Sequence, residues 1–106
     1  MPSHPTHSRL VSSAANDPEI CEVVAIFVSE MPGRIRFANE AFMRGDRLRL
    51  QFWAHQLKGC AGGYGFAQIS TEAAGLEETI VRCATSEEIL TALLRVTDLC
   101  ERTTID

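Results

Sequence analysis

From residue 17 onward, apolar side chains return every three or four positions, and no stretch alternates apolar and polar residues as a half-buried strand does. A chain with this spacing folds into helices that bury their apolar stripes against one another. Its 106 residues suffice for one domain with a modest core. Because short connections make consecutive helices antiparallel neighbours, the predicted fold is an all-α, antiparallel up-down helical bundle.

Capping and breaking residues divide this pattern into helices. Aspartate, or threonine with glutamate three positions later, is a preferred start, and proline or glycine is a preferred end. The predicted starts are Asp17, Asp46 and Thr85 with Glu88, and the predicted ends are Pro32-Gly33 and Gly45. The stretch before residue 17 is rich in Ser, Pro and His and has no periodicity, so we expect a flexible tail over residues 1–16 and the helical domain over residues 17–106.

Charge and hydropathy exclude several classes of function. Ten Lys and Arg residues against fourteen Asp and Glu give a net charge of −4, which is unsuited to binding the phosphate backbone of nucleic acids. No apolar run is long enough to span a membrane, and the first residues lack the apolar segment of a signal peptide. A cytoplasmic location is therefore expected. His4 and His7 have no carboxylate or thiol cluster beside them, so no metal site is expected either.

The four cysteines are far apart in the sequence. They are Cys21, Cys60, Cys83 and Cys100, and no Cys-x-x-Cys pair is present. This spacing does not indicate a zinc or disulfide-exchange site. We expect four small buried thiols on the apolar stripes, which argues against a thiol sensor.

Residues 47–64 form the segment with the most unusual surface. On a helical wheel, Leu50, Trp53, Ala54, Leu57, Cys60, Ala61 and Tyr64 share one face, which predicts the core side. The opposite, solvent-facing side carries His55 together with Leu48, Gln51, Phe52, Lys58, Gly59 and Gly62. Two large apolar residues are unusual on a solvent-facing side. An interior glycine is unusual as well, because glycine costs about 1 kcal/mol in a helix relative to alanine.

This arrangement suits a residue that carries a phosphoryl group. A neutral imidazole is a nucleophile near neutral pH, and His55 is predicted to be exposed. Lys58, the only lysine of the chain, stands three residues later, where it can offset phosphoryl charge and disfavour the imidazolium form. Gly59 leaves the space above the ring open. One ring nitrogen attacks, and the other needs an acceptor from a neighbouring helix.

The chain resembles the histidine-containing phosphotransfer (HPt) domain family over about residues 17–103. The resemblance rests on Ala54, on His55-Gln56-Leu57-Lys58-Gly59, on Gly65 and on Leu76-Glu77. One departure is Gly62-Gly63, where small Ala or Ser residues are usual, and it is expected to shorten or loosen the end of that helix.

The resemblance implies an antiparallel up-down four-helix bundle, with the first predicted helix as an additional short N-terminal helix. It also implies a phosphorelay intermediate of two-component signal transduction. His55 would accept a phosphoryl group on Nε2 from a receiver-domain aspartate or a hybrid histidine kinase, and pass it to the aspartate of another receiver domain. Nδ1 would face the next helix, where Glu77 is the favoured partner and Gln68 a second possibility. Mg²⁺ is expected on the partner receiver domain, and the chain itself needs no cofactor.

Alternatives remain at this stage. The glycines between residues 59 and 65 lack the spacing of a phosphate-binding loop, so no ATP site and no kinase activity are expected. The rival function is a non-catalytic helical adaptor that docks receiver domains without carrying phosphate. Arg44, Arg47 and Arg49 are either solvated charges or help to steer acidic partners. A monomer is favoured, whereas the sequence does not indicate the upstream kinase, the downstream regulator or the direction of transfer.

Overall fold

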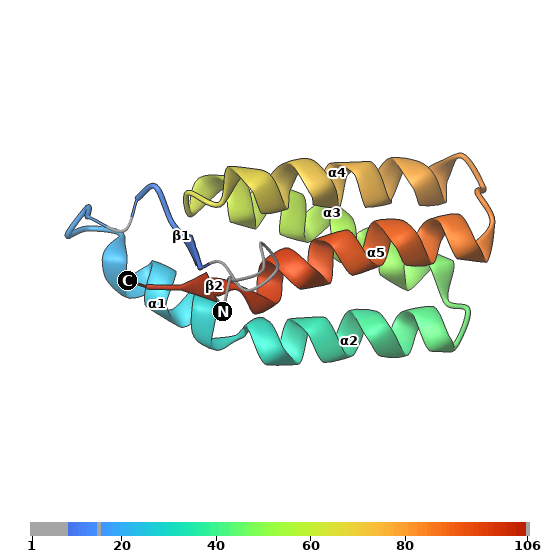
Figure 1. Cartoon of the computed structure of the whole chain (residues 1–106), viewed down its shortest axis with the longest axis horizontal. Coiled ribbons are helices and arrows are strands. Elements are labelled where there is room, and N and C mark those ends of the chain that lie inside the picture. The colour runs from blue at the N-terminus through green and yellow to red at the C-terminus, as the bar shows by residue number, and fades with distance from the viewer. Residues whose placement is uncertain (1–8, 15, 106) are drawn as a thin grey trace, which may run out of the picture.

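The computed structural model describes residues 9–14 and 16–105, and Figure 1 shows an all-α architecture apart from two very short strands. The helices are α1 (Cys21–Ser29), α2 (Met31–Met43), α3 (Arg47–Gly63), α4 (Ala67–Val81) and α5 (Ser86–Glu101). The strands are β1 (Leu10–Val11) and β2 (Thr103–Thr104), which pair in parallel. In this part of the chain, no helix combines the length and the apolar character needed to cross a bilayer.

The four longer helices lie lengthwise beside one another, and short loops join consecutive helices at opposite ends (Figure 1). Helix α3 packs against α4, α4 packs against α5, and α2 contacts both α3 and α5. One apolar core lies between these four helices and α1, and its largest fully buried side chains include Phe27, Leu50, Leu57, Phe66 and Ile69. Helix α1 lies at the end of the molecule where β1 and β2 meet (Figure 1).

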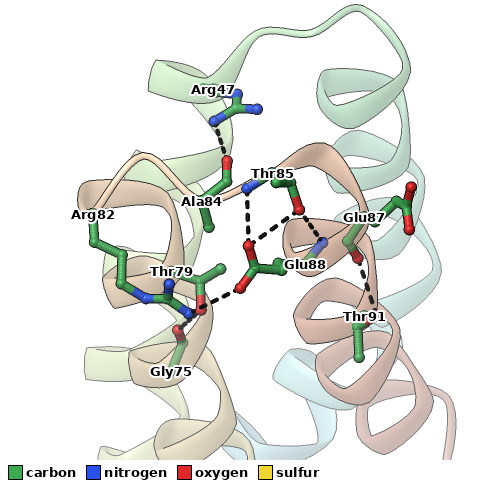
Figure 2. Close-up of polar contacts among 9 residues, drawn as sticks. All are labelled: Arg47, Gly75, Thr79, Arg82, Ala84, Thr85, Glu87, Glu88 and Thr91. Atoms are coloured by element: carbon green, nitrogen blue, oxygen red, sulfur yellow. Dashed lines mark hydrogen bonds and ion pairs between the residues drawn. The ribbon is translucent and has the colours of Figure 1, made fainter.

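The predicted starts of α3 and α5 are confirmed. The Asp46 side chain accepts a hydrogen bond from the backbone N–H of Arg49, which satisfies one of the free donors at the start of α3. Thr85 and Glu88 form a capping box, with each side chain accepting from the backbone N–H of the other at 3.2 Å (Figure 2). Pro32 lies in the first turn of α2, where its missing N–H costs nothing, so the predicted break begins a new helix.

Two expectations about the chain are wrong. Asp17 does not cap a helix: its side chain accepts from the Glu19 N–H in a preceding turn, and α1 begins at Cys21. Of the four cysteines, Cys100 alone is buried, and burial raises the pKa of its thiol to about 12. Cys60 is partly buried, whereas Cys21 and Cys83 are exposed. Cys83 lies beyond the end of α4 with φ of 59°, so the helical spacing that predicted its burial no longer applies there.

Residues 10–14, which we call the N-terminal strap, lie within the stretch expected to be a flexible tail. Leu10 and Val11 pair with Thr103 and Thr104, and the Ser13 N–H donates to the Gly65 carbonyl at 3.0 Å. Ser12 is buried, and its hydroxyl donates to the carbonyl of Tyr64. The strap therefore ties the C-terminal end of the chain to the turn between α3 and α4. Local sequence signals do not predict the strap, because its strand β1 and the partner strand β2 are each only two residues long. His4 and His7 lie outside the described residues.

Candidate functional site

His55 lies in the middle of α3 and points away from the core. Its neighbours Ala54 and Leu57 are buried, which fixes the rotation of the helix and leaves the His55 side chain 62% exposed. The apolar residues of the same side are exposed too, Leu48 at 77% and Phe52 at 61%. The helical wheel therefore predicted this face correctly. An imidazole in this position is accessible to a second macromolecule.

Glu77 of α4 contacts two residues of α3 with its two carboxylate oxygens. Its Oε2 lies 2.9 Å from His55 Nδ1, and its Oε1 accepts from Lys58 Nζ at 3.0 Å. Because an ionised carboxylate only accepts hydrogen bonds, Nδ1 carries the ring hydrogen and the lone pair of Nε2 stays free. The Glu77 side chain is 19% exposed, so the bridge lies at the edge of the core.

Lys58 is the main cause that lowers the pKa of Glu77. Its hydrogen bond to the carboxylate outweighs partial burial, which acts in the opposite direction, and the hydrogen bond from His55 lowers the pKa further. Glu77 is therefore ionised at neutral pH, when it can hold the imidazole in one tautomer and orientation.

Close packing between α3 and α4 brings Glu77 to the imidazole. The Ser70 hydroxyl donates to the carbonyl of Lys58 at 2.8 Å, which joins the two backbones near one end. A Cβ atom added to Gly62 would lie 3.3 Å from Ser70 Oγ, so glycine permits this approach. Gln68 is nine residues before Glu77, or about 13 Å along the helix axis. The structure thus places Glu77, and not Gln68, against His55 Nδ1.

An open groove runs beside His55 between α2 and α3. Its lining consists of Phe37, Asp46, Leu48, Arg49, Gln51, Phe52, His55 and Glu77. Phe37, which comes from α2, is exposed, and the Arg49 guanidinium lies 5.9 Å from the centre of its ring. Arg49 also pairs with Asp46 at 3.3 Å. The groove therefore combines apolar surface with a few charged groups, as docking surfaces for proteins do.

The family model of the Hpt domain matches residues 22–103. The chain belongs to the Hpt domain family. Comparison with curated proteins and with solved structures gave no match. The matched range runs from the second residue of α1 to the first residue of β2 and includes His55, Lys58 and Glu77. Phosphotransfer in two-component signalling, through interaction with receiver domains and kinases, is the function that this family implies.

Sequence reasoning places most of the site of this Hpt domain but not all of it. The structure gathers His55, Lys58 and Glu77 at one point, with Leu48, Gln51 and Phe52 along the groove. A Cβ atom on Gly59 would meet no atom of the described residues within 4 Å, so that position is open. Gly62 instead lies against α4, and α3 continues through Gly63 without the expected early end.

Two features of the Hpt domain site were missed. Phe37 lies off the apolar stripe of its helix, and an exposed aromatic side chain at that position was the available signal. The ion pair of Lys58 with Glu77 depends on the separation of α3 and α4, which no spacing along the sequence indicates. Among the arginines, Arg47 donates to the Ala84 carbonyl at 2.7 Å and so supports the α4–α5 turn (Figure 2).

Proposed function

We propose that His55 is the residue of this Hpt domain that carries the phosphoryl group. It accepts the group from the aspartyl phosphate of a receiver domain, or from a hybrid histidine kinase, and passes it to the aspartate of another receiver. The observation that carries the proposal is the contact of Nδ1 with Glu77 on an otherwise exposed ring. That contact leaves Nε2 as a nucleophile that faces solvent.

Each transfer exchanges one phosphorus bond for another. The lone pair of Nε2 forms the new N–P bond while the O–P bond of the aspartyl phosphate breaks, and its electron pair stays on the receiver's carboxylate. The hydrogen on Nδ1 remains in its hydrogen bond with Glu77, whose negative charge stabilises the positive charge that develops on the ring. The reverse transfer follows the same path, with the aspartate as the nucleophile. Mg²⁺ would belong to the receiver domain and offset charge on the transferring group there.

The groove beside His55 is the surface we propose for receiver domains. Leu48, Phe52 and Phe37 offer apolar side chains for a partner to cover, and Gly59 leaves space close to the ring. Gln51 lies in the same groove as a polar contact. Arg49 and Asp46, which pair with each other at 3.3 Å, add one cation and one anion to this surface.

The test is transfer from a panel of phosphorylated receiver domains to the wild type and to His55→Gln. We expect an acid-labile, base-stable label on the wild type and none on the variant. Unfolding in urea should give the same free energy for both proteins within about 0.5 kcal/mol, because the side chain lies outside the core. Label on folded His55→Gln would overturn the assignment. Tight binding of a receiver without any transfer would instead favour the non-catalytic adaptor.

The finer details of the architecture belong to the same proposal. We propose that α2 to α5 form the antiparallel up-down four-helix bundle, with α1 as the additional short helix, and the placement of the loops at alternate ends supports this arrangement. The boundary between a tail over residues 1–16 and a domain over residues 17–106, the monomeric state and the cytoplasmic location stay predictions.

A further inference from the structure

Lys58 is already paired before any phosphoryl group arrives. Its Nζ atom donates to Glu77 Oε1 at 3.0 Å, while the other oxygen of the same carboxylate holds His55 Nδ1 at 2.9 Å. One carboxylate group therefore bridges the ammonium group of Lys58 and the ring of His55. Lys58 cannot offset phosphoryl charge fully while this pair persists, because the carboxylate already neutralises it.

The alternative position for the ammonium group is close by. Lysine is a compact cation on a flexible stem of four carbons, and the Lys58 side chain is partly exposed. A phosphoryl group on His55 adds close to two negative charges at the same surface. Lys58 stands three residues after His55 on α3, a spacing that makes two helical side chains neighbours, so its flexible stem lies beside the ring that would carry these charges.

We propose that Lys58 exchanges partners during the reaction, from Glu77 in the unmodified domain to the phosphoryl oxygens once His55 is phosphorylated. The inference rests on the proposed phosphorylation of His55. It assigns Glu77 two successive roles. Glu77 holds both the ring and the lysine at rest, and it holds the ring alone afterwards, when its whole negative charge faces the positively charged ring. No bond other than those of the phosphoryl transfer forms or breaks in this exchange.

The exchange predicts that the effect of Lys58→Met on the transfer equilibrium depends on whether Glu77 is present. In the wild type, the gain from pairing Lys58 with phosphate is reduced by the loss of its pair with Glu77. Lys58→Met should therefore shift the transfer equilibrium away from phosphohistidine only a few-fold. In a Glu77→Gln background the lysine has no resting anion, and the same substitution should shift the equilibrium by about tenfold or more, as expected for one charge-assisted hydrogen bond.

The experiment is a double-mutant cycle on the equilibrium constant of transfer with one receiver domain. The four proteins are the wild type, Lys58→Met, Glu77→Gln and the double variant, at about 0.15 M salt so that distant charges are screened. A permanent pair predicts the opposite result, because a lysine that acts only through Glu77 has no effect once Glu77 is replaced. Loss of the Lys58→Met effect in the Glu77→Gln background would thus overturn the exchange.

Two control variants separate the exchange from general effects of charge. Lys58→Arg keeps the cation and should keep most of the equilibrium constant. Glu78→Gln removes a neighbouring exposed carboxylate on α4 and should leave the effect of Lys58→Met unchanged. If Glu78→Gln enlarges that effect as much as Glu77→Gln does, the specific pair is not responsible and the inference fails.

Chemical labelling with phosphoramidate keeps this inference distinct from the proposed function. It phosphorylates histidine without a receiver domain, and the ¹⁵N resonance of Lys58 Nζ then reports on the partner of the lysine. We expect this resonance to shift on labelling of His55 both in the wild type and in Glu77→Gln. An unshifted lysine on a domain labelled at His55 would refute the exchange alone, whereas absence of label at His55 from every receiver domain of the panel would refute the proposed function and the exchange with it.

Discussion

At Gly59 an added methyl group would meet no atom of the described residues within 4 Å, although the residue lies inside α3. Gly59→Ala should therefore raise the free energy of unfolding by about 0.5–1 kcal/mol, because alanine loses less conformational entropy in a helix. The same methyl group should slow transfer from a receiver domain, because it fills space close to His55. Urea denaturation and transfer kinetics on one preparation measure both effects.

Gly75→Ala is the matched control for this prediction. Gly75 lies inside α4, and an added methyl group would also meet open space there. We expect a similar gain in stability with unchanged transfer kinetics. Equal transfer rates for Gly59→Ala and the wild type would show that no partner approaches the ring from this side.

Glu77 should make stability depend on pH. The hydrogen bond from Lys58 is the main cause that lowers its pKa below 4.5 in the folded chain, so the unfolded chain takes up this proton at a higher pH. The stabilisation is therefore fully present above the unfolded pKa and is lost as the pH falls through the folded value. We expect the stability difference between the wild type and Glu77→Gln to shrink from about pH 5 downward. Urea unfolding of both proteins at a series of pH values measures it, and a constant difference would contradict the prediction.

At the scale of the elements, the stability of α5 depends on the capping box in its first turn. Thr85 accepts from the Glu88 N–H and Glu88 accepts from the Thr85 N–H, while Arg82 pairs with Glu88 at 3.6 Å (Figure 2). Thr85→Ala should lower the free energy of unfolding by about 1 kcal/mol, because the backbone N–H of Glu88 loses its acceptor at the helix start. Thermal unfolding measures the loss, and Thr91→Ala, in the interior of the same helix, is the control. A loss no larger than that of Thr91→Ala would show that the capping box contributes nothing.

The boundaries of the helices were predictable where a strong local signal coincides with the helix end. Asp46 and the pair Thr85–Glu88 mark the starts of α3 and α5, where the structure has them. Asp17 is an equally good signal, but its side chain serves a turn before α1. Cys83 was misplaced because the chain leaves the helical path at Val81. Spacing along the sequence describes a helix only while the helix continues.

The spacing of residues predicted the part of the candidate site that lies on one helix, and the family resemblance added Glu77 on the next helix. The wheel of α3 places His55, Lys58 and Phe52 on the exposed side, and the structure agrees. Phe37 belongs to another helix, and the double contact of Glu77 depends on how closely α3 and α4 pack. Interhelical distances arise from the whole core, so they could not be read from these residues.

At the scale of the whole molecule, the N-terminal strap connects segments that are distant in the sequence. It crosses the turn at Gly65, which has φ of 86° and where an added Cβ would lie 2.8 Å from the Ala14 nitrogen. Gly65→Ala combines an unfavourable backbone conformation with a steric clash, so we expect a loss of more than about 1 kcal/mol in stability. Hydrogen exchange should show faster exchange at the N–H of Leu10 and Ser13, because the strap is displaced.

Removal of residues 1–14 separates the two contributions. Without the strap the clash disappears, so Gly65→Ala should destabilise the shortened chain less than the full chain, through the backbone conformation alone. An equal loss in both chains would show that the strap does not press on this turn.

The single lysine of the sequence has a practical consequence. Lys58 Nζ is the only side-chain primary amine among these 106 residues, and it lies at the candidate site. Reductive methylation with isotopically enriched formaldehyde keeps the charge of a lysine, so it would install one spectroscopic reporter at that atom without a substitution. The domain thus offers an addressable position from which binding and turnover can be followed in real time.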